Sequence, residues 1–381
     1  MNKIKIGDIC EILNGFAFRS EKYINSGVRI IRISNVQKGY IEDTNPVFYP
    51  KNECELDKYM LESGDLLMSL TGNVGRVAIV SDDFLPAALN QRVACLRMKS
   101  NKILKGFLFH ILNSDFFEQK SILSSKGVAQ KNMSTEWLKG YEIPLYSENK
   151  QKEIVAILDG IRACIVFRKK ELDLLDNLIK ARFVEMFGDP SINPKKYTVQ
   201  PLSTIAKYWN GLTYKPEDVS KEGIIVLRSS NIQNDQLDFS DTVRVNCRIA
   251  DNKFVKDNDI LMCSRNGSAK LVGKVALIKN LPKAMSFGAF MMIIRSEYYP
   301  YLMTYFQMPA FRAQIITGAT TTINQITGKM LDNVKLPIPD LSEIKEYLAF
   351  IQQIDKSKVV VQKALDEARL LFNSLMQKYF G

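Results

Sequence analysis

The segment Gly27-Val-Arg-Ile-Ile-Arg-Ile-Ser-Asn-Val-Gln37 returns 196 residues later as Gly223-Ile-Ile-Val-Leu-Arg-Ser-Ser-Asn-Ile-Gln233. A second pair of segments, Asp65-Leu-Leu-Met68 and Asp259-Ile-Leu-Met262, keeps nearly the same spacing. Similar pairs recur along the whole chain at offsets between 193 and 198 residues. Because chance matches would not hold such a register, the sequence predicts a tandem duplication with an internal pseudo-twofold repeat.

Each half has the same order of segments. Short runs rich in β-branched residues come first, among them Val28–Ile33 and Val93–Arg97, and they predict strands. A helical stretch follows at about Gly106–Leu123 in the first half and Pro300–Thr317 in the second. A proline-bounded strand then leads into a long helix. This order predicts an α+β fold in which two tandem mixed α/β domains are joined by two long helices.

The predicted boundaries place globular domains at residues 1–147 and 191–341 and long helices at 148–190 and 342–381. The chain has 381 residues, with 52 Lys and Arg against 41 Asp and Glu, and its net charge is +11. The globular segments carry +3 and +7 of this charge, whereas the helices carry 0 and +1. A membrane-binding amphipathic helix would show the opposite distribution. The charge therefore favours two separate contacts with a polyanion.

The long helices share a regular apolar pattern. Their apolar residues recur at alternating spacings of three and four, which is typical of a coiled-coil seam. A helix that packs only on its own domain is the alternative, but the duplication favours pairing of the two helices with each other. Asp355 and Lys358 would interrupt the seam, at a cost in stability that could fix its register. The residues predicted to form the seam are Ile154, Ile161, Ile165, Leu172, Leu175, Ile179, Ile344, Leu348, Ile351, Leu365, Phe372 and Leu375.

Few side chains are available for catalysis. The single histidine, His110, lies in the apolar run Phe107-Leu-Phe-His-Ile-Leu112 and is expected to be a buried structural residue. The six cysteines are widely spaced and lack a C-x-x-C pair, as is typical of free thiols in a reducing compartment. The sequence contains no P-loop, G-x-G-x-x-G or H-E-x-x-H pattern. We therefore predict neither a catalytic site nor a metal site in this chain.

The sequence also indicates a cytoplasmic protein without a membrane span. The residues up to Asp8 are charged and lack the apolar region of a signal peptide. No apolar run approaches the roughly 20 residues that a membrane-spanning helix needs.

Several motifs, taken together, resemble a known family. Arg32-Ile-Ser-Asn-Val-Gln37 and Arg228-Ser-Ser-Asn-Ile-Gln233 share one pattern. Gln151-Lys-Glu-Ile-Val-Ala-Ile-Leu158 lies near the start of the first long helix, and Met186-Phe-Gly-Asp-Pro190 lies at its end. In order and duplication, and over the whole chain, these motifs resemble the specificity subunit of Type I restriction–modification systems. The second long helix lacks a counterpart of Gln151, so docking of partner subunits on the two helices need not be equivalent.

The resemblance implies a division of labour between subunits. Two target-recognition domains would each read one half of a split, asymmetric site in double-stranded DNA, and the long helices would form an antiparallel coiled coil as the spacer between them. Two modification subunits would dock on this frame and methylate adenine from S-adenosylmethionine, and restriction subunits would add cleavage that uses ATP and Mg. This chain would carry no catalytic chemistry or cofactor itself. A stand-alone DNA-binding regulator that dimerises through the helices is the alternative.

Comparison of the halves separates two kinds of residue. Residues that both halves share, such as Arg32 with Arg228 and Asn35 with Asn231, cannot make the halves read different sequences. They are expected to hold the fold or to face phosphates. Base readers are expected in three divergent loops, which are residues 71–76, 90–92 and 126–132 of the first half and 264–270, 288–290 and 320–325 of the second. The predicted DNA-binding residues are Arg19, Thr71, Asn73, Arg76, Asn90, Gln91, Arg92, Lys126, Gln130, Lys131, Asn132, Lys215, Arg265, Asn266, Ser268, Lys270, Asn324 and Gln325.

Overall fold

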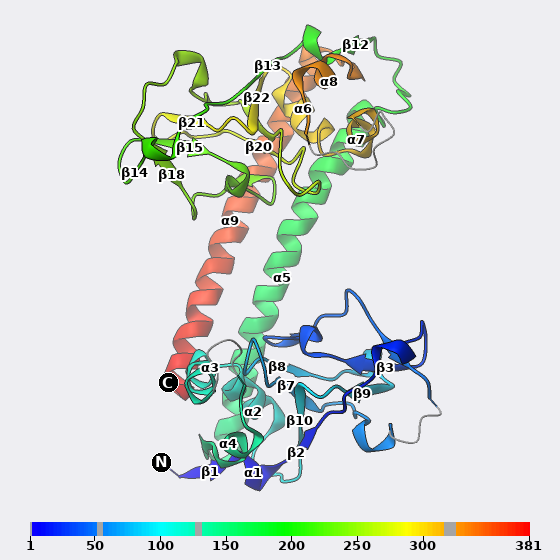
Figure 1. Cartoon of the computed structure of the whole chain (residues 1–381), viewed down its shortest axis with the longest axis vertical. Helices are drawn as coiled ribbons and strands as arrows, with labels where there is room; N and C mark the ends of the chain where they lie inside the picture. Colours follow the sequence, from blue (N-terminus) through cyan, green and yellow to red (C-terminus); the bar gives the residue numbers. More distant parts are fainter. Residues whose placement is uncertain (1, 52–55, 126–131, 316–324) are drawn as a thin grey trace. The chain divides into compact units, whose positions relative to one another are not determined.

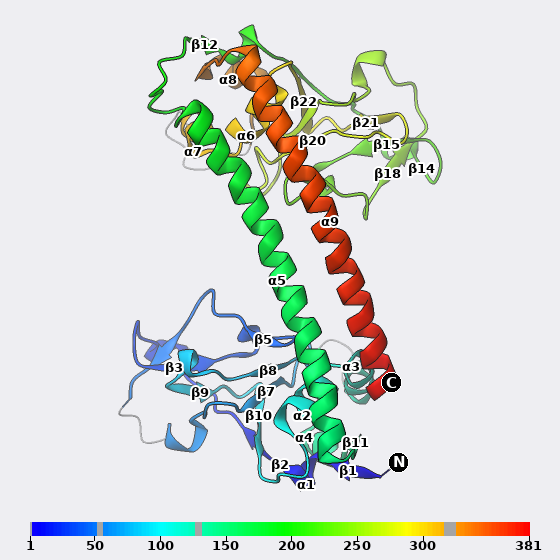
Figure 2. The same cartoon turned by 180° about the vertical axis from the view of Figure 1, so that it is seen from behind.

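The computed structural model describes residues 2–51, 56–125, 132–315 and 325–381, which form two compact units (Figures 1 and 2). Unit 1 consists of Met1–Lys170 with Gln362–Gly381, and unit 2 consists of Glu171–Val361. Helix α5 (Glu148–Phe187) starts in unit 1 and ends in unit 2, whereas α9 (Leu341–Phe380) starts in unit 2 and ends in unit 1. The boundaries predicted from the sequence divide the chain before each long helix instead, and they stay predictions.

The two units are built around the same four-stranded antiparallel sheet. Its order is β2-β10-β7-β8 in unit 1 and β13-β22-β19-β20 in unit 2. The shared order confirms the predicted duplication. The strands are β2 (Cys10–Asn14), β7 (Leu66–Ser69), β8 (Val77–Ile79), β10 (Val93–Met98), β13 (Lys207–Asn210), β19 (Ile260–Cys263), β20 (Val275–Leu277) and β22 (Met291–Arg295).

Each unit also contains a smaller sheet with one parallel pair of strands. The order is β6-β3-β9 in unit 1 and β14-β18-β15-β21 in unit 2, and the parallel pairs are β3 with β9 and β15 with β21. Short antiparallel pairs join β4 to β5, β16 to β17, β1 to β11 and β12 to β23. These strands are β1 (Lys3–Lys5), β3 (Val28–Ile31), β4 (Val36–Gln37), β5 (Tyr40–Ile41), β6 (Phe48–Tyr49), β9 (Ala87–Leu89), β11 (Glu142–Pro144), β12 (Val199–Pro201), β14 (Val219–Ser220), β15 (Ile224–Leu227), β16 (Ile232–Gln233), β17 (Gln236–Leu237), β18 (Val243–Val245), β21 (Met285–Phe287) and β23 (Lys335–Pro337).

The helical stretch predicted in each half consists of two short helices. In unit 1 the break falls at Asn113, because the Ser114 side chain accepts a hydrogen bond from the Phe117 N–H at 3.1 Å and caps the second helix. In unit 2 the second helix begins at Pro309. The short helices are α1 (Ile6–Ile9), α2 (Lys105–Leu112), α3 (Asp115–Ser124), α4 (Thr135–Gly140), α6 (Tyr299–Tyr305), α7 (Pro309–Ile315) and α8 (Gly328–Asp332).

The long helices pair in antiparallel orientation, as the sequence predicted. In unit 1, Leu158 near the start of α5 and Phe380 at the end of α9 belong to one buried core. In unit 2 the opposite ends meet, since the rings of Phe183 and Tyr347 lie 5.8 Å apart and the Tyr347 hydroxyl donates to the Ile179 carbonyl at 3.2 Å. All the residues of the predicted seam are buried or half-buried.

The two polar residues in the seam region of α9 form ion pairs. Lys358 Nζ lies 2.6 Å from Asp176 Oδ1 on α5, and the Lys358 side chain is only 15% exposed. Asp355 Oδ2 lies 2.6 Å from Lys279 Nζ, which follows β20. These charges therefore link α9 to α5 and to the globular part of unit 2, and their role in register stays a prediction. Within the described part of the chain, every helix is too short or too polar to cross a lipid bilayer.

Candidate nucleic-acid interface

Asn35 and Asn231 are buried residues that fix an equivalent turn in the two units. The side-chain oxygen of Asn35 accepts a hydrogen bond from the Arg32 N–H at 2.9 Å, and its amide donates to the Glu42 carbonyl at 2.7 Å. Asn231, which is 0% exposed, holds its turn by the same kind of bonds. Both shared asparagines therefore hold the fold and cannot reach a base.

Each unit also contains an ion pair that sequence reasoning missed. Asp65 accepts hydrogen bonds from Arg97 Nε at 3.0 Å and Nη2 at 2.6 Å, and Asp259 accepts from Arg295 at 2.6 and 2.7 Å. The two aspartates are 4% and 1% exposed. The internal repeat could have revealed these ion pairs, because both aspartates begin matched segments of the sequence. Each pair ties the residue just before β7 or β19 to the neighbouring strand, β10 or β22, at the end remote from the divergent loops.

The divergent loops of unit 1 meet at one end of the central sheet. The Leu70 N–H, just after β7, donates to the Arg92 carbonyl at 3.0 Å. The Met133 N–H donates in turn to the Leu70 carbonyl at 2.9 Å, and Thr71 forms a β-bridge with Asn132. These backbone bonds place described residues of all three predicted loops side by side.

Unit 2 repeats this junction with different side chains. The Ser264 N–H donates to the Phe290 carbonyl at 2.9 Å, and the Ile326 N–H donates to the Ser264 carbonyl at 2.7 Å. Arg265 forms the β-bridge with Gln325. Because the backbone pattern is shared and the side chains differ, this junction is the place where two copies of one fold could recognise different ligands.

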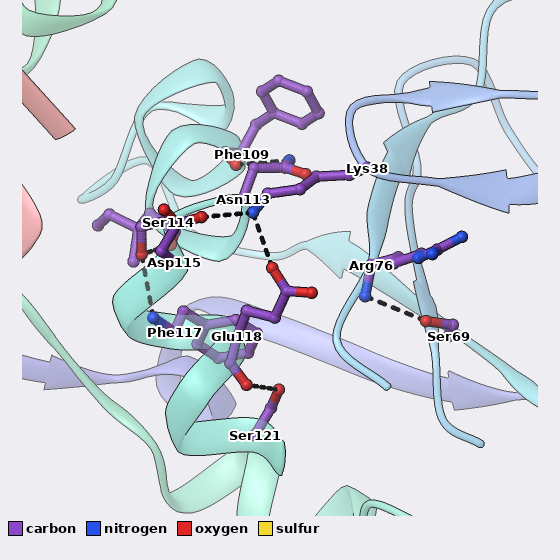
Figure 3. Close-up of polar contacts among 11 residues, drawn as sticks. Lys38, Ser69, Arg76, Phe109, Asn113, Ser114, Asp115, Phe117, Glu118 and Ser121 are labelled. Carbon is purple, nitrogen blue, oxygen red and sulfur yellow. Dashed lines mark hydrogen bonds and ion pairs between the residues drawn. The ribbon is translucent and has the colours of Figure 1, made fainter. Parts of the chain in front are cut away.

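Two residues of the predicted set are tied within their own unit. The Arg76 N–H donates to Ser69 Oγ at 3.0 Å (Figure 3), and its guanidinium donates to Gln37 Oε1. The Asn266 amide donates to Ser229 Oγ at 3.1 Å. Both side chains are consequently half-buried and less free to reach a ligand than their loop positions suggested.

The other predicted residues differ in exposure, and their contact with DNA stays a prediction. Thr71 and Asn90 are half-buried. Lys126, Gln130, Lys131 and Asn324 lie outside the described residues. Exposed side chains are those of Arg19, Asn73, Gln91, Arg92, Asn132, Lys215, Arg265, Ser268, Lys270 and Gln325.

Lys38, in the turn between β4 and β5, is neutralised within unit 1. Its Nζ lies 2.6 Å from Asp115 and 2.7 Å from Glu118 (Figure 3). Burial lowers the pKa of Lys38, but the hydrogen bonds to these two carboxylates outweigh burial and raise it. This cation is therefore already paired and contributes little to the attraction of a polyanion.

His110 and three of the described cysteines, Cys10, Cys95 and Cys263, are buried, whereas Cys164 is exposed and Cys247 is half-buried. His110 is 1% exposed, and its Nε2 lies 2.8 Å from Asp159 Oδ1. Burial lowers the pKa of His110, and the hydrogen bond to Asp159 opposes this shift. Burial raises the pKa of Cys10 to about 12, so the reactive thiolate is strongly disfavoured. Among the residues that the structure describes, no group of three or more His, Cys, Asp or Glu side chains could hold a metal ion.

Gln151 is a buried residue that fixes the start of α5, and the expected difference in docking between the two helices stays a prediction. Gln151 is 1% exposed and lies inside unit 1. Its side-chain oxygen accepts from the Leu104 N–H at 2.8 Å, and its amide donates to the carbonyls of Lys102 at 3.0 Å and Tyr146 at 2.9 Å. The glutamine thus fixes the start of α5 to the loop before α2. The buried Ile344 fills the corresponding position of α9.

Comparison with known proteins places the chain in a family. The model of the Type I restriction modification DNA specificity domain matches residues 1–177 and again residues 194–368. The chain belongs to this family. The double match also follows the duplication seen in the sequence and in the sheets.

Specificity-subunit relatives agree with this assignment, and a solved structure has a similar fold. The EcoBI specificity subunit of Escherichia coli is 23% identical, over 98% of this chain and 83% of the relative. The MjaVIII specificity subunit of Methanocaldococcus jannaschii is 31% identical, over 46% of this chain and 43% of the relative. The fold is similar to the crystal structure of a Type I restriction–modification S subunit from M. genitalium, with a TM-score of 0.58, 14% identity and coverage of 100% of this chain and 96% of that chain.

Proposed function

We propose that this chain recognises a bipartite, asymmetric site in double-stranded DNA and directs Type I modification and restriction subunits to it. The observation that carries the proposal is the repeated junction. One backbone arrangement presents Thr71 and Arg92 in unit 1 but Arg265 and Phe290 in unit 2. Two such junctions would read two different half-sites, and the positive charge of the globular segments would hold the phosphates.

Exposed apolar residues on the long helices support the docking of two copies of one partner. Val166 and Phe167 on α5 are 60% and 64% exposed, and Val359 and Val360 on α9 are 68% and 69% exposed. The two pairs lie 193 residues apart, at equivalent positions of the repeat. Exposed apolar pairs on a long helix are unfavourable in water unless a partner covers them. Their repetition fits the docking of two modification subunits.

The catalytic chemistry would then belong to the partners. In this proposal the modification subunits bind S-adenosylmethionine and methylate adenine, and the restriction subunits use ATP and Mg to cleave DNA. The chain itself is non-catalytic and works in the cytoplasm. The rival function, a stand-alone regulator that dimerises through its helices, would need no methyltransferase.

Co-purification with a modification subunit tests the proposal. The chain with Phe167→Ser and Val360→Ser should lose the subunit, whereas Ile192→Ser should keep it. Ile192 is the matched control because it is an apolar residue that is 75% exposed outside both long helices. A wild-type chain that binds specific DNA as a dimer and never retains the methyltransferase would favour the regulator and contradict the proposal.

DNA binding provides a second test of the same proposal. Each phosphate contact lowers the logarithm of the binding constant by about 0.9 for every tenfold rise in salt. We therefore expect binding of a target duplex by the assembled complex to weaken steeply between low and moderate salt. A flat titration would refute phosphate anchoring by the basic globular segments.

A further inference from the structure

The junction of each unit contains one arginine, but the two arginines lie on different sides of it. In unit 1 the arginine is Arg92, whose carbonyl accepts the bond from the residue after β7, and Thr71 lies across from it. In unit 2 the aromatic Phe290 occupies the position of Arg92, and Arg265 occupies that of Thr71. Each junction therefore has one arginine, which lies before β10 in unit 1 and after β19 in unit 2.

In unit 2 this arginine is held in a defined orientation. The Arg265 guanidinium lies over the Phe290 ring, with its central carbon 5.4 Å from the ring centroid. The backbone of Arg265 is fixed on both sides, because its N–H donates to the Phe290 carbonyl at 3.1 Å and it bridges to Gln325. Among the described residues, no carboxylate forms an ion pair with Arg265. The guanidinium is therefore oriented but still free to donate.

The exposure of Phe290 also needs an explanation. Its side chain is 59% exposed in a loop, where a large apolar group gains little from burial. Stacking on the Phe290 ring limits the rotamers of the Arg265 side chain, so less conformational freedom is lost when the arginine binds a ligand. A ring in this place is consequently useful to binding even though it contributes little to the core.

We propose that Arg265, oriented by Phe290, recognises a guanine through its major-groove edge in the half-site read by unit 2. The planar fork of arginine matches the O6 and N7 acceptors of guanine, and no other base presents the same pair of acceptors there. Phe290 is a positioning residue in this arrangement. The inference rests on the proposed function and adds to it one base, one reading residue and one supporting ring.

The test uses the full chain assembled with its modification subunits, and a set of duplexes in which each base pair of the half-site read by unit 2 is replaced in turn. Relative methylation rates give the discrimination at every position. For Arg265→Ala we expect discrimination at one G·C pair to fall by about 5- to 150-fold, the range of one bidentate contact. Discrimination at the other positions should not change.

Three further variants separate a reading role from a structural or phosphate-binding role. Arg265→Lys keeps the charge but not the fork, so it should retain overall affinity and lose most of the guanine preference. Phe290→Leu should relax the same position, and Phe290→Tyr should restore it. Arg92→Ala is the matched control, and it should alter only the half-site read by unit 1.

Several outcomes would overturn the inference. If Arg265→Ala weakens all duplexes equally, Arg265 binds phosphate and reads no base. If Arg265→Lys keeps the full preference, the planar fork of arginine is not what selects guanine. If Phe290→Leu leaves the preference unchanged, the ring does not position the arginine. These results would leave the proposed function intact. A wild-type complex without a bipartite preference would instead refute the proposed function, and the inference with it.

Discussion

Replacement of Asn231 by alanine should destabilise unit 2 without changing which DNA sequence is recognised. The Asn231 side chain is fully buried and makes three hydrogen bonds, from the Arg228 N–H at 2.9 Å and to the carbonyls of Asp238 at 2.8 Å and Asp241 at 2.7 Å. Alanine would leave these three backbone groups without a partner. Partial rearrangement of the turn toward water reduces the loss, so we expect a cost of about 3 kcal/mol.

The expected effect is large enough to measure by thermal unfolding. For a unit of this size, 1 kcal/mol corresponds to about 2–4 °C, so the transition of unit 2 should fall by about 6–12 °C. Asn35→Ala should lower the stability of unit 1 by less than Asn231→Ala lowers that of unit 2, because the Asn35 side chain makes one hydrogen bond fewer. Asn252→Ala is the control, since Asn252 is exposed and its carbonyl, which the substitution keeps, accepts the bond from Trp209.

The specificity of the variant decides between a structural role and a reading role. Below its lowered melting temperature, Asn231→Ala should methylate or bind the same sequence as the wild type. A variant of wild-type stability that had lost recognition of one half-site would contradict the structural role. Such a result would make Asn231 a base reader despite its burial.

Three further substitutions test other parts of the structure. Asp176→Ala leaves the mostly buried Lys358 unpaired and should lower the stability by about 1 kcal/mol, whereas Lys358→Met should be neutral or stabilising. If thermal unfolding shows Lys358→Met to be less stable than Asp176→Ala, the polar pair does not cost stability in the seam. Burial lowers the pKa of His110 in the folded chain, so the stability should fall as the pH drops from about 7 to 5, and this loss should be smaller for His110→Gln. If chemical denaturation gives the same pH profile for both proteins, the lowered pKa of His110 is refuted. Gln151→Ala should lower the stability of unit 1 by about 2 kcal/mol but leave co-purification with a modification subunit intact. Loss of the subunit from a stable variant would show that Gln151 takes part in docking.

The features best predicted from the sequence are those that depend on periodicity and repetition. The long helices could be predicted because apolar residues such as Ile154 and Ile344 follow a regular spacing. The pairing of the helices could be inferred because the pattern occurs twice. The shared role of Asn35 and Asn231 followed from the same logic, since residues common to both halves cannot distinguish two ligands.

Tertiary partners could not be predicted in this way. The burial of Gln151 is one example, because its three hydrogen-bond partners lie in segments distant along the chain or just before the helix. Tyr347 and Leu158 were missed because they lie beside the ideal seam positions and fill the core between helix and sheet. The stacking of Arg265 on Phe290 depends on a backbone junction that no spacing rule contains.

Two units that share one fold should read two different half-sites. Sequencing of methylated adenines in DNA exposed to the assembled modification complex tests this most directly. We expect one asymmetric motif, with two specified parts separated by a gap of fixed length and unspecified sequence. Arg265→Ala should change only one of the parts, and Arg92→Ala only the other. A single contiguous motif, or two identical half-sites, would contradict the account.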